Sequence, residues 1–414
     1  MQIDFSPPDI NEDDIQAVSE VLRSGWITSG PRVKEFEAAL AEWTKTPRVA
    51  VLNSATAALQ CVLELLAIGP GDEVITPAYT YTASASVICH VGASPVLVDV
   101  APGQYQMDTE SILAAITPRT KAVIAVDIGG VMCDYNALRK TLSSPQAFRR
   151  FAPRVGTMQE IFQQIPIIAD AAHSFGSSYL GQPSGTVADF TVFSFHAVKN
   201  LTTAEGGAIT WRNNLVDEAT STEIYQRIKL YCLHGQTKDA LAKSADGAWE
   251  YDVVAPLYKC NMTDIAAALG LSQLKRYAQM LKRRHQLIGL YTERLLADAA
   301  QGGYSLDILS HDDGHGSVSN GHLMMVRLLG CDDAFRRRFI IKMAEKGVSC
   351  NVHFKPLPLL SAYAALGFDI SSFSQAFKQY ENQVSLPLHT LLSDQDVQYV
   401  CDSFKSAYAE TSAG

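Results

Sequence analysis

The sequence has no excess of positive charge and no pair of cysteines at metal-ligand spacing. Its 414 residues carry a formal net charge of −9, which disfavours a nucleic-acid partner because phosphate backbones are bound through clustered lysine and arginine. The eight cysteines are scattered without a CxxC motif, which favours reduced thiols over disulfides or a zinc site. We therefore expect neither nucleic acid nor a metal ion to be bound.

Long apolar runs are missing as well. The longest, Ala57 to Ile68, is interrupted by Gln60 and Glu64 and is too short to cross a bilayer. The first eight residues have neither the basic region nor the apolar segment of a secretory signal. These features predict a cytoplasmic protein without a membrane partner. A hydrophobic content of 47% over this length is enough for two domains.

The first 250 residues alternate between strand-like and helix-like runs, the pattern of a mostly parallel sheet with helices on both faces. The α/β fold that we predict has a seven-stranded sheet with strands at Arg48 to Asn53, Glu73 to Pro77, Pro95 to Val100, Lys121 to Ile128, Ile165 to Asp170, Phe190 to Phe195 and Gly207 to Trp211. A helix is expected from Thr56 to Ile68, and a long amphipathic helix from Thr263 to about Leu296. Residues 1–260 would form the large domain and residues 261–414 a smaller α+β domain.

One lysine stands just past a predicted buried strand. Phe190 to Phe195 is rich in aromatic and β-branched residues, and Lys199 follows it on a loop at the edge where open α/β sheets bind ligands. A lysine at such a place can hold an aldehyde cofactor as a Schiff base, and nearby charge would lower its pKa enough to make it nucleophilic. A lone loop lysine is more often a solvated charge, so the interpretation depends on its neighbours.

Pyridoxal phosphate needs an amine, a carboxylate for its ring nitrogen, donors for its phosphate and a flat group against its ring. Asp170 ends an apolar strand, where a carboxylate is costly without a cationic partner, although it could equally cap the next segment. Ala55 and Thr56 begin a helix whose free amides would bind an anion, and Ser194 is a further phosphate donor. Tyr81 could stack on the ring.

These residues lie in segments that together resemble the DegT/StrS family of pyridoxal-phosphate-dependent sugar aminotransferases. The similarity runs in order along the chain through SGWITSGP (24–31), NSATAAL (53–59), DEVITPAYTYTASA (72–85), ITPRTKAVI (116–124), DAAHSFG (170–176), FSFHAVKNLTTAEGG (193–207) and NMTDIAAALGLSQL (261–274). The resemblance implies the aspartate aminotransferase fold (fold type I) and a homodimer with shared active sites. It also implies transfer of an amino group, usually from glutamate, to a nucleotide-linked keto sugar.

By this resemblance, Lys199 is the Schiff-base lysine, Asp170 the partner of the pyridine nitrogen, and His173 the group near the phenolic oxygen. Tyr81 takes the stacking position, and Ala55, Thr56 and Ser194 form the phosphate site. In many relatives the neighbouring subunit also reaches the phosphate, from a turn that here reads Leu257-Tyr258-Lys259-Cys260-Asn261. Either Lys259 or Asn261 is expected to make that contact.

Substrate contacts are implied at both ends of the chain. Trp26, Thr28 and Ser29 match the segment that contacts the sugar, and His353 and Lys355 match a stretch that reaches the nucleotide sugar. The motifs FSFHAVKN (193–200) and YKCNMTD (258–264) resemble those of enzymes that aminate 4-keto sugars. This resemblance implies a UDP-linked 4-keto sugar as substrate, which would give an amino sugar for surface polysaccharide or glycan.

Two departures from the family pattern are expected near the mouth of the site. Asp127-Ile128-Gly129-Gly130 replaces a His-x-x-Gly segment, and the polar stretch 140–164 is an insertion, either an extra surface helix or a lid.

Two other functions stay open. A keto-sugar dehydratase of the same fold would have histidine in place of Lys199, and a cofactor-binding regulatory protein would show no turnover. A nicotinamide enzyme is disfavoured because no GxGxxG motif opens the first strand-to-helix turn.

Overall fold

The computed structural model describes residues 1–243, 249–314 and 316–413. Its larger sheet has seven strands in the order β1-β9-β8-β5-β4-β2-β3, and only β9 runs antiparallel to its neighbours. The strands are β1 (Val49–Leu52), β2 (Glu73–Pro77), β3 (Ser94–Val98), β4 (Thr120–Val126), β5 (Ile167–Asp170), β8 (Phe190–Ser194) and β9 (Gly207–Trp211). All seven predicted strands are confirmed, and the observed ends differ from the predicted ones by at most two residues.

Two apolar layers cover this sheet, as expected for strands that are buried on both faces. The helices of this part of the chain are α1 (Glu12–Ser24), α2 (Pro31–Thr44), α3 (Ala55–Leu65), α4 (Ala83–His90), α5 (Thr109–Ala115), α6 (Tyr135–Leu142), α7 (Pro145–Arg150), α8 (Glu218–Cys232) and α9 (Ala240–Lys243). Helix α3 begins with Ser54 as its N-cap, and it ends three residues before the predicted end at Ile68.

A second, three-stranded antiparallel sheet has the order β10-β11-β12. Its strands are β10 (Ser305–Ile308), β11 (Met324–Leu329) and β12 (Gln383–Leu386), and its helices are α11 (Asp333–Glu345), α12 (Ser361–Ala365), α13 (Ser374–Glu381) and α14 (Asp394–Ala413). This α+β part is the smaller one that the sequence predicts. Ile3 pairs with Val348, so the N-terminal segment also reaches this part.

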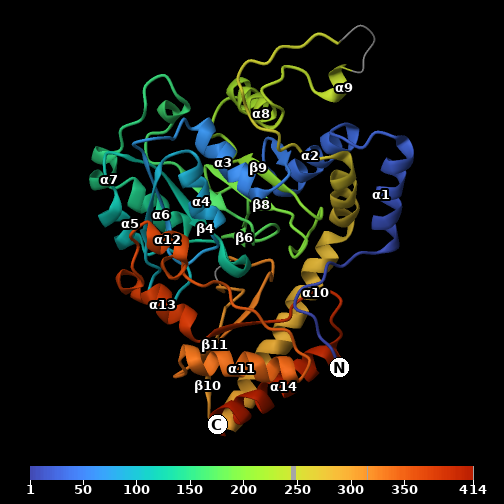
Figure 1. The fold of residues 1–414 in the computed structure, drawn as a ribbon, viewed down its shortest axis with the longest axis vertical. Coiled ribbons are helices and arrows are strands. Elements are labelled where there is room, and N and C mark those ends of the chain that lie inside the picture. The colour runs from blue at the N-terminus through green and yellow to red at the C-terminus, as the bar shows by residue number, and fades with distance from the viewer. Residues whose placement is uncertain (244–248, 315, 414) are drawn as a thin grey trace.

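Helix α10 (Asp264–Gly302) joins the two parts, and it ends six residues beyond the predicted Leu296. Figure 1 shows it running from the neighbourhood of α1 and α2 to α14. Tyr277 and Met280 pack in the core of the large sheet, whereas Leu287 and Tyr291 pack in that of the small one. The domain boundary at residue 260 therefore stays a prediction. Within the described residues, no helix combines the length and apolarity needed to cross a membrane.

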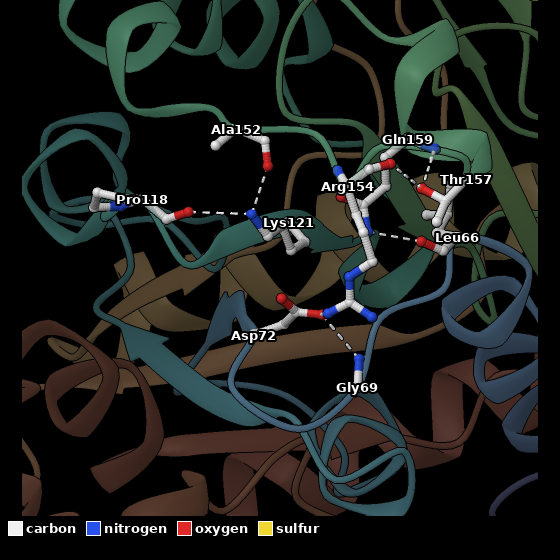
Figure 2. Close-up of polar contacts among 9 residues, drawn as sticks. All are labelled: Leu66, Gly69, Asp72, Pro118, Lys121, Ala152, Arg154, Thr157 and Gln159. Atoms are coloured by element: carbon white, nitrogen blue, oxygen red, sulfur yellow. Dashed lines mark hydrogen bonds and ion pairs between the residues drawn. The ribbon is translucent and has the colours of Figure 1, made fainter.

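The insertion after α6 does not lie where it was expected. It forms α7 and a 3₁₀ turn, η2 (Met158–Ile161), and it is fixed at the amino ends of β2 and β4 (Figure 2). Arg154 pairs with Asp72, 2.8 Å apart, just before β2, and Lys121 in β4 donates 2.6 Å to the carbonyl oxygen of Ala152. The prediction that it borders the mouth of the site is wrong. A helix-to-strand connection in a parallel sheet returns to the amino end of the next strand, the edge opposite the ligand-binding one.

Candidate active site

The carboxyl ends of β2, β5 and β8 border a cavity of about 400 Å³. Eight of the predicted site residues line it: Ala55, Thr56, Tyr81, Asp170, His173, Ser194, Lys199 and His353. A larger cavity, of about 790 Å³, lies between residues 103–140 and 307–319 and is lined by none of the predicted site residues. The smaller cavity is therefore the candidate active site, because it brings together the groups with the relevant chemistry.

Lys199 lies on the loop between β8 and β9, where its backbone N–H donates to the carbonyl oxygen of His196, 2.9 Å away. Among the described residues, none forms a hydrogen bond or ion pair with its ammonium group. Burial lowers the pKa of Lys199 from 10.5 to about 8, and the negative charge of Asp170 opposes the shift. A substantial share of the amine is therefore neutral near physiological pH, the form that attacks an aldehyde.

Asp170 closes β5 and is buried. One carboxylate oxygen accepts from the hydroxyl of Ser84 at 2.7 Å, and the other accepts from the N–H of Ala172 at 3.2 Å. Burial raises the pKa of Asp170, whereas these hydrogen bonds and the charge of Lys199 lower it. A buried carboxylate with no closely paired cation suits a protonated ring nitrogen, so the residue fits the role that the sequence predicts.

His173 follows Asp170 on the same loop and is buried. The N–H of Gly129 donates to its Nδ1 at 3.3 Å, which makes Nε2 the protonated nitrogen of the neutral ring. Burial, together with the charge of Lys199, holds the pKa of His173 well below its ordinary value. Segment 127–130, which departs from the family pattern, therefore contacts the site, as expected.

Asp127 holds the segment 127–130 in place through hydrogen bonds to its carboxylate. Its carboxylate accepts from the N–H of Cys133 and the hydroxyl of Tyr135, each at 2.9 Å, and from the hydroxyl of Ser174 at 2.6 Å. Burial raises its pKa to about 6. Asp127 thus holds the loop of Gly129 against the segment that carries His173.

The predicted phosphate site is the amino end of α3. Ala55 and Thr56 line the cavity there, and Ser54 accepts from the N–H of Ala57 at 3.1 Å. A Cβ on Gly207 would lie 2.4 Å from the backbone nitrogen of Ala55, so only glycine lets β9 approach this turn closely. Free amides beside a cavity, at a helix start, are an anion site, and the residues present fit a phosphate group.

Tyr81 stands at the cavity mouth with 60% of its surface exposed. Its ring lies 5.7 Å from that of Phe354. The exposed face is free to stack on a flat ligand. Together with Lys199, Asp170 and the α3 terminus, it meets the four requirements of pyridoxal phosphate.

Five predicted residues form a second group that does not line this cavity. Asn261 donates 2.6 Å to the Ser29 hydroxyl and also contacts Lys259, and the Trp26 indole N–H donates 3.2 Å to the Ser29 carbonyl oxygen. Thr28 joins them through its carbonyl oxygen, which accepts from the N–H of Asp264 at 3.1 Å. Lys355 is exposed and is also absent from the lining, unlike His353.

The lining also includes residues that the sequence did not single out, among them His322, Phe354 and Phe5. Phe354 stacks on His173 with ring centroids 5.7 Å apart, and Phe5 stacks on His353 at 5.5 Å. His322 comes from the segment before β11. No local pattern in the sequence singles these residues out, because their role arises from the packing of the small part against the large one.

The comparisons with known proteins agree with this geometry. The family model for the DegT/DnrJ/EryC1/StrS aminotransferase family matches residues 8–146 and 157–405. The chain is 34% identical over 408 residues to spore coat polysaccharide biosynthesis protein SpsC of Bacillus subtilis (strain 168), covering 97% of this chain and 96% of that one. It is 35% identical over 412 residues to UDP-4-amino-4-deoxy-L-arabinose–oxoglutarate aminotransferase of Shewanella sediminis (strain HAW-EB3), covering 97% of each.

Among solved structures, the putative sugar aminotransferase Spr1654 from Streptococcus pneumoniae matches in its PMP form with a TM-score of 0.91 and 46% identity, over 100% of this chain and 99% of that one. Its PLP form matches with a TM-score of 0.92 and 46% identity, over 99% and 100%. The fold and the site thus define a pyridoxal-phosphate-dependent sugar aminotransferase. The chain belongs to the DegT/DnrJ/EryC1/StrS aminotransferase family. The predicted fold class, family, cofactor and enzyme class are confirmed.

Proposed function

We propose that this protein transfers an amino group from glutamate to the C4 keto group of a UDP-linked sugar, to supply an amino sugar for surface polysaccharide or glycan. The observation that carries the proposal is the placement of Lys199 and Asp170 in one cavity, where the charge of each shifts the pKa of the other. The sugar and the donor are supported by the name of the Shewanella relative, a UDP-4-amino sugar–oxoglutarate aminotransferase, and the pathway by that of the Bacillus relative.

When bound, pyridoxal phosphate supplies an aldehyde carbon that combines with amines and a ring that accepts electrons. In this assignment, Lys199 would hold the cofactor and then move a proton at the carbon that gains or loses nitrogen, a task suited to a pKa of about 8. Asp170 would keep the ring nitrogen protonated. His173 would serve the phenolic oxygen as a donor, and Ala55, Thr56 and Ser194 would bind the phosphate.

The second group of residues points to a dimer. Trp26, Thr28, Ser29, Lys259 and Asn261 are held together outside the lining of the cavity of their own chain, as expected if they complete the cavity of a second copy. We propose a homodimer in which Lys259 or Asn261 reaches the partner's phosphate site. His353, on the cavity wall, and Lys355, outside it, would contact the nucleotide sugar.

Reduction with borohydride tests the Lys199 assignment directly. The protein with bound cofactor should lose its visible absorbance on reduction, and mass spectrometry should locate the stable adduct on the peptide that carries Lys199. Lys199→Ala should abolish the adduct and the activity. Lys121→Ala is the matched control, because Lys121 is a buried lysine but lies at the opposite edge. An adduct that persists in Lys199→Ala would refute the assignment.

The substrate is tested in two half-reactions. Glutamate should convert the coloured form to the amine form, and a UDP-linked 4-keto sugar should restore it. A 3-keto sugar and a dTDP-linked sugar serve as competitors. Restoration by the 3-keto sugar alone would contradict the C4 assignment, and failure of every amino donor would favour a regulatory protein.

The shared sites are tested by mixing two inactive variants, Lys199→Ala and the double variant Lys259→Ala/Asn261→Ala. If the sites are shared, random pairing restores about a quarter of the wild-type activity, because half of the sites in each mixed dimer are intact. No recovery from a mixture that sedimentation shows to be dimeric and exchanged would contradict the proposal.

A further inference from the structure

His322 lines the cavity and belongs to the small part of the molecule. It is buried and precedes β11, and its backbone is held by Arg284 of α10. The Arg284 guanidinium donates to the carbonyl oxygens of Gly321 and His322 at 2.8 and 2.9 Å. A Cβ on Gly321 would lie 2.7 Å from Ile288, so the loop packs tightly on this helix. The position of His322 is therefore fixed by the backbone around it.

The hydrogen bonds around Asn200 define the protonation of His322. The Asn200 amide nitrogen donates to the Asn320 carbonyl oxygen at 3.0 Å, so its Oδ1 faces His322 as an acceptor. His322 Nδ1 lies 2.9 Å from that oxygen and must carry the proton. Since Asn200 directly follows Lys199, this bond ties the small part of the molecule to the residue next to the amine.

His173 packs against the ring of His322 and has the opposite tautomer. Its Nδ1 accepts from Gly129, whereas Nδ1 of His322 donates, and the two ring centroids are 4.3 Å apart. Burial, the neighbouring His173 and the charge of Lys199 hold the pKa of His322 well below its ordinary value. Both rings are therefore neutral at physiological pH, and each keeps one defined donor and one defined acceptor.

We propose that His322 is a positioning residue for transamination: its Nδ1–H holds Asn200, and its ring holds His173, so that Lys199 and His173 keep their places on the cavity wall. The proposal rests on the function assigned to Lys199 above. It gives the small part of the molecule a role in proton transfer, because a shift of this loop would move both groups together. Misplacement of a proton-transfer group by a fraction of an ångström lowers turnover more than binding.

Two substitutions separate the hydrogen bond from the packing. His322→Asn places an amide donor near the position of Nδ1, whereas His322→Phe keeps the ring against His173 but removes the donor. For the glutamate half-reaction we expect His322→Phe to lower the rate constant about tenfold or more with little change in the half-saturating concentration. The pH midpoint of the visible band should shift in the same variant. His322→Asn should recover most of the loss.

A control variant disturbs the same loop without touching Asn200. His285 of α10 contacts the Ser319 carbonyl oxygen at 2.6 Å and does not line the cavity. His285→Phe should lower the thermal midpoint of unfolding but leave the pH midpoint of the band unchanged. Thermal unfolding and cofactor content of each variant show whether it is folded and loaded.

The results separate the two proposals. A borohydride adduct on Lys199 with an unchanged rate and pH profile in His322→Phe would overturn the role of His322 alone. Equal impairment of His322→Asn and His322→Phe would overturn the role of the Nδ1–H donor, since restoring a donor would then recover no activity. No adduct on Lys199 in the wild-type protein would overturn the proposed function itself. In a double-mutant cycle with Asn200→Ala, we expect the two rate losses to be strongly non-additive.

Discussion

The two edges of the large sheet both bury charged groups, but they satisfy them differently. At the amino edge, Lys121 donates to two carbonyl oxygens, of Pro118 at 3.1 Å and Ala152 at 2.6 Å, and Asp72 is paired with Arg154 (Figure 2). Burial lowers the pKa of both Lys121 and Lys199. At the carboxyl edge, however, the Lys199 ammonium has no hydrogen-bond partner among the described residues, and burial raises the pKa of Asp170.

The difference distinguishes structural charge from functional charge. Around Asp72 and Lys121, the polar contacts at the amino edge are completed within the chain: the Gln159 amide donates to the Leu66 carbonyl oxygen at 2.8 Å, and the Gly69 N–H donates to Asp72 at 3.0 Å. The carboxyl edge instead leaves an amine and a carboxylate facing a cavity. Buried groups whose pKa values are shifted and whose partners are incomplete mark the place where a ligand completes the site.

The largest expected effect is the difference in kcat between substitutions of two buried aspartates, Asp170 and Asp72. Asp170→Asn removes the charge opposite the ring nitrogen, and we expect kcat to fall by about 100-fold or more while the Lys199 adduct still forms. Asp72→Asn, at the other edge, should leave kcat within about threefold and lower only the free energy of unfolding. Steady-state kinetics and borohydride reduction of both variants check the contrast. A large loss of kcat in Asp72→Asn would break the distinction between the edges.

The half-buried Lys199 and the buried Lys121 should respond to substitution in opposite directions when the cofactor is absent. Lys199 has a folded-state pKa of about 8 against an ordinary value of 10.5, so protonating it destabilises the fold, fully below pH 8 and less as the pH rises toward 10.5. Lys199→Met should therefore raise the free energy of unfolding at pH 7 by up to roughly 3 kcal/mol.

Lys121→Met should instead lower the free energy of unfolding by about 1 to 3 kcal/mol, because two buried carbonyl oxygens lose their donor. Urea unfolding of the cofactor-free proteins at pH 7 and pH 9.5 measures both changes. The advantage of Lys199→Met should shrink at the higher pH. Equal destabilisation by both substitutions would show that the ammonium of Lys199 is satisfied after all.

The smallest expected effect is the loss of stability caused by a substitution in the insertion. Arg154→Ala leaves the buried Asp72 carboxylate without its cation, but the Gly69 N–H still donates to it and the arginine side chain is 45% exposed. We expect a loss of about 1 kcal/mol in stability and no change in kcat. Denaturant unfolding and steady-state kinetics test this. A change in substrate specificity would mean that the insertion communicates with the cavity.

Much of the site was predictable because its chemistry is local. Lys199, Asp170, Ala55 and Thr56 each follow or precede a strand within a short segment, and the carboxyl ends of parallel strands meet at one edge. The position of the insertion was predictable from the same rule, since it precedes β5 and must return to the amino edge. The insertion follows Asp127 closely in sequence but not in space, because α6 carries the chain from the carboxyl edge back to the amino edge.

The sequence by itself determined the order of strands and helices, the residues that we propose to carry the cofactor chemistry and the family to which the chain belongs. These follow from periodicity, from turn positions and from motifs that each span a few residues. Only the tertiary structure decided that His322 and Phe354 line the cavity, that Trp26, Ser29 and Asn261 gather outside its lining, and which nitrogen of His173 and of His322 carries the proton. The physical reason is that these features depend on contacts between segments far apart in the chain, such as Gly129 with His173 and Asn200 with His322, which leave no periodic trace in the sequence.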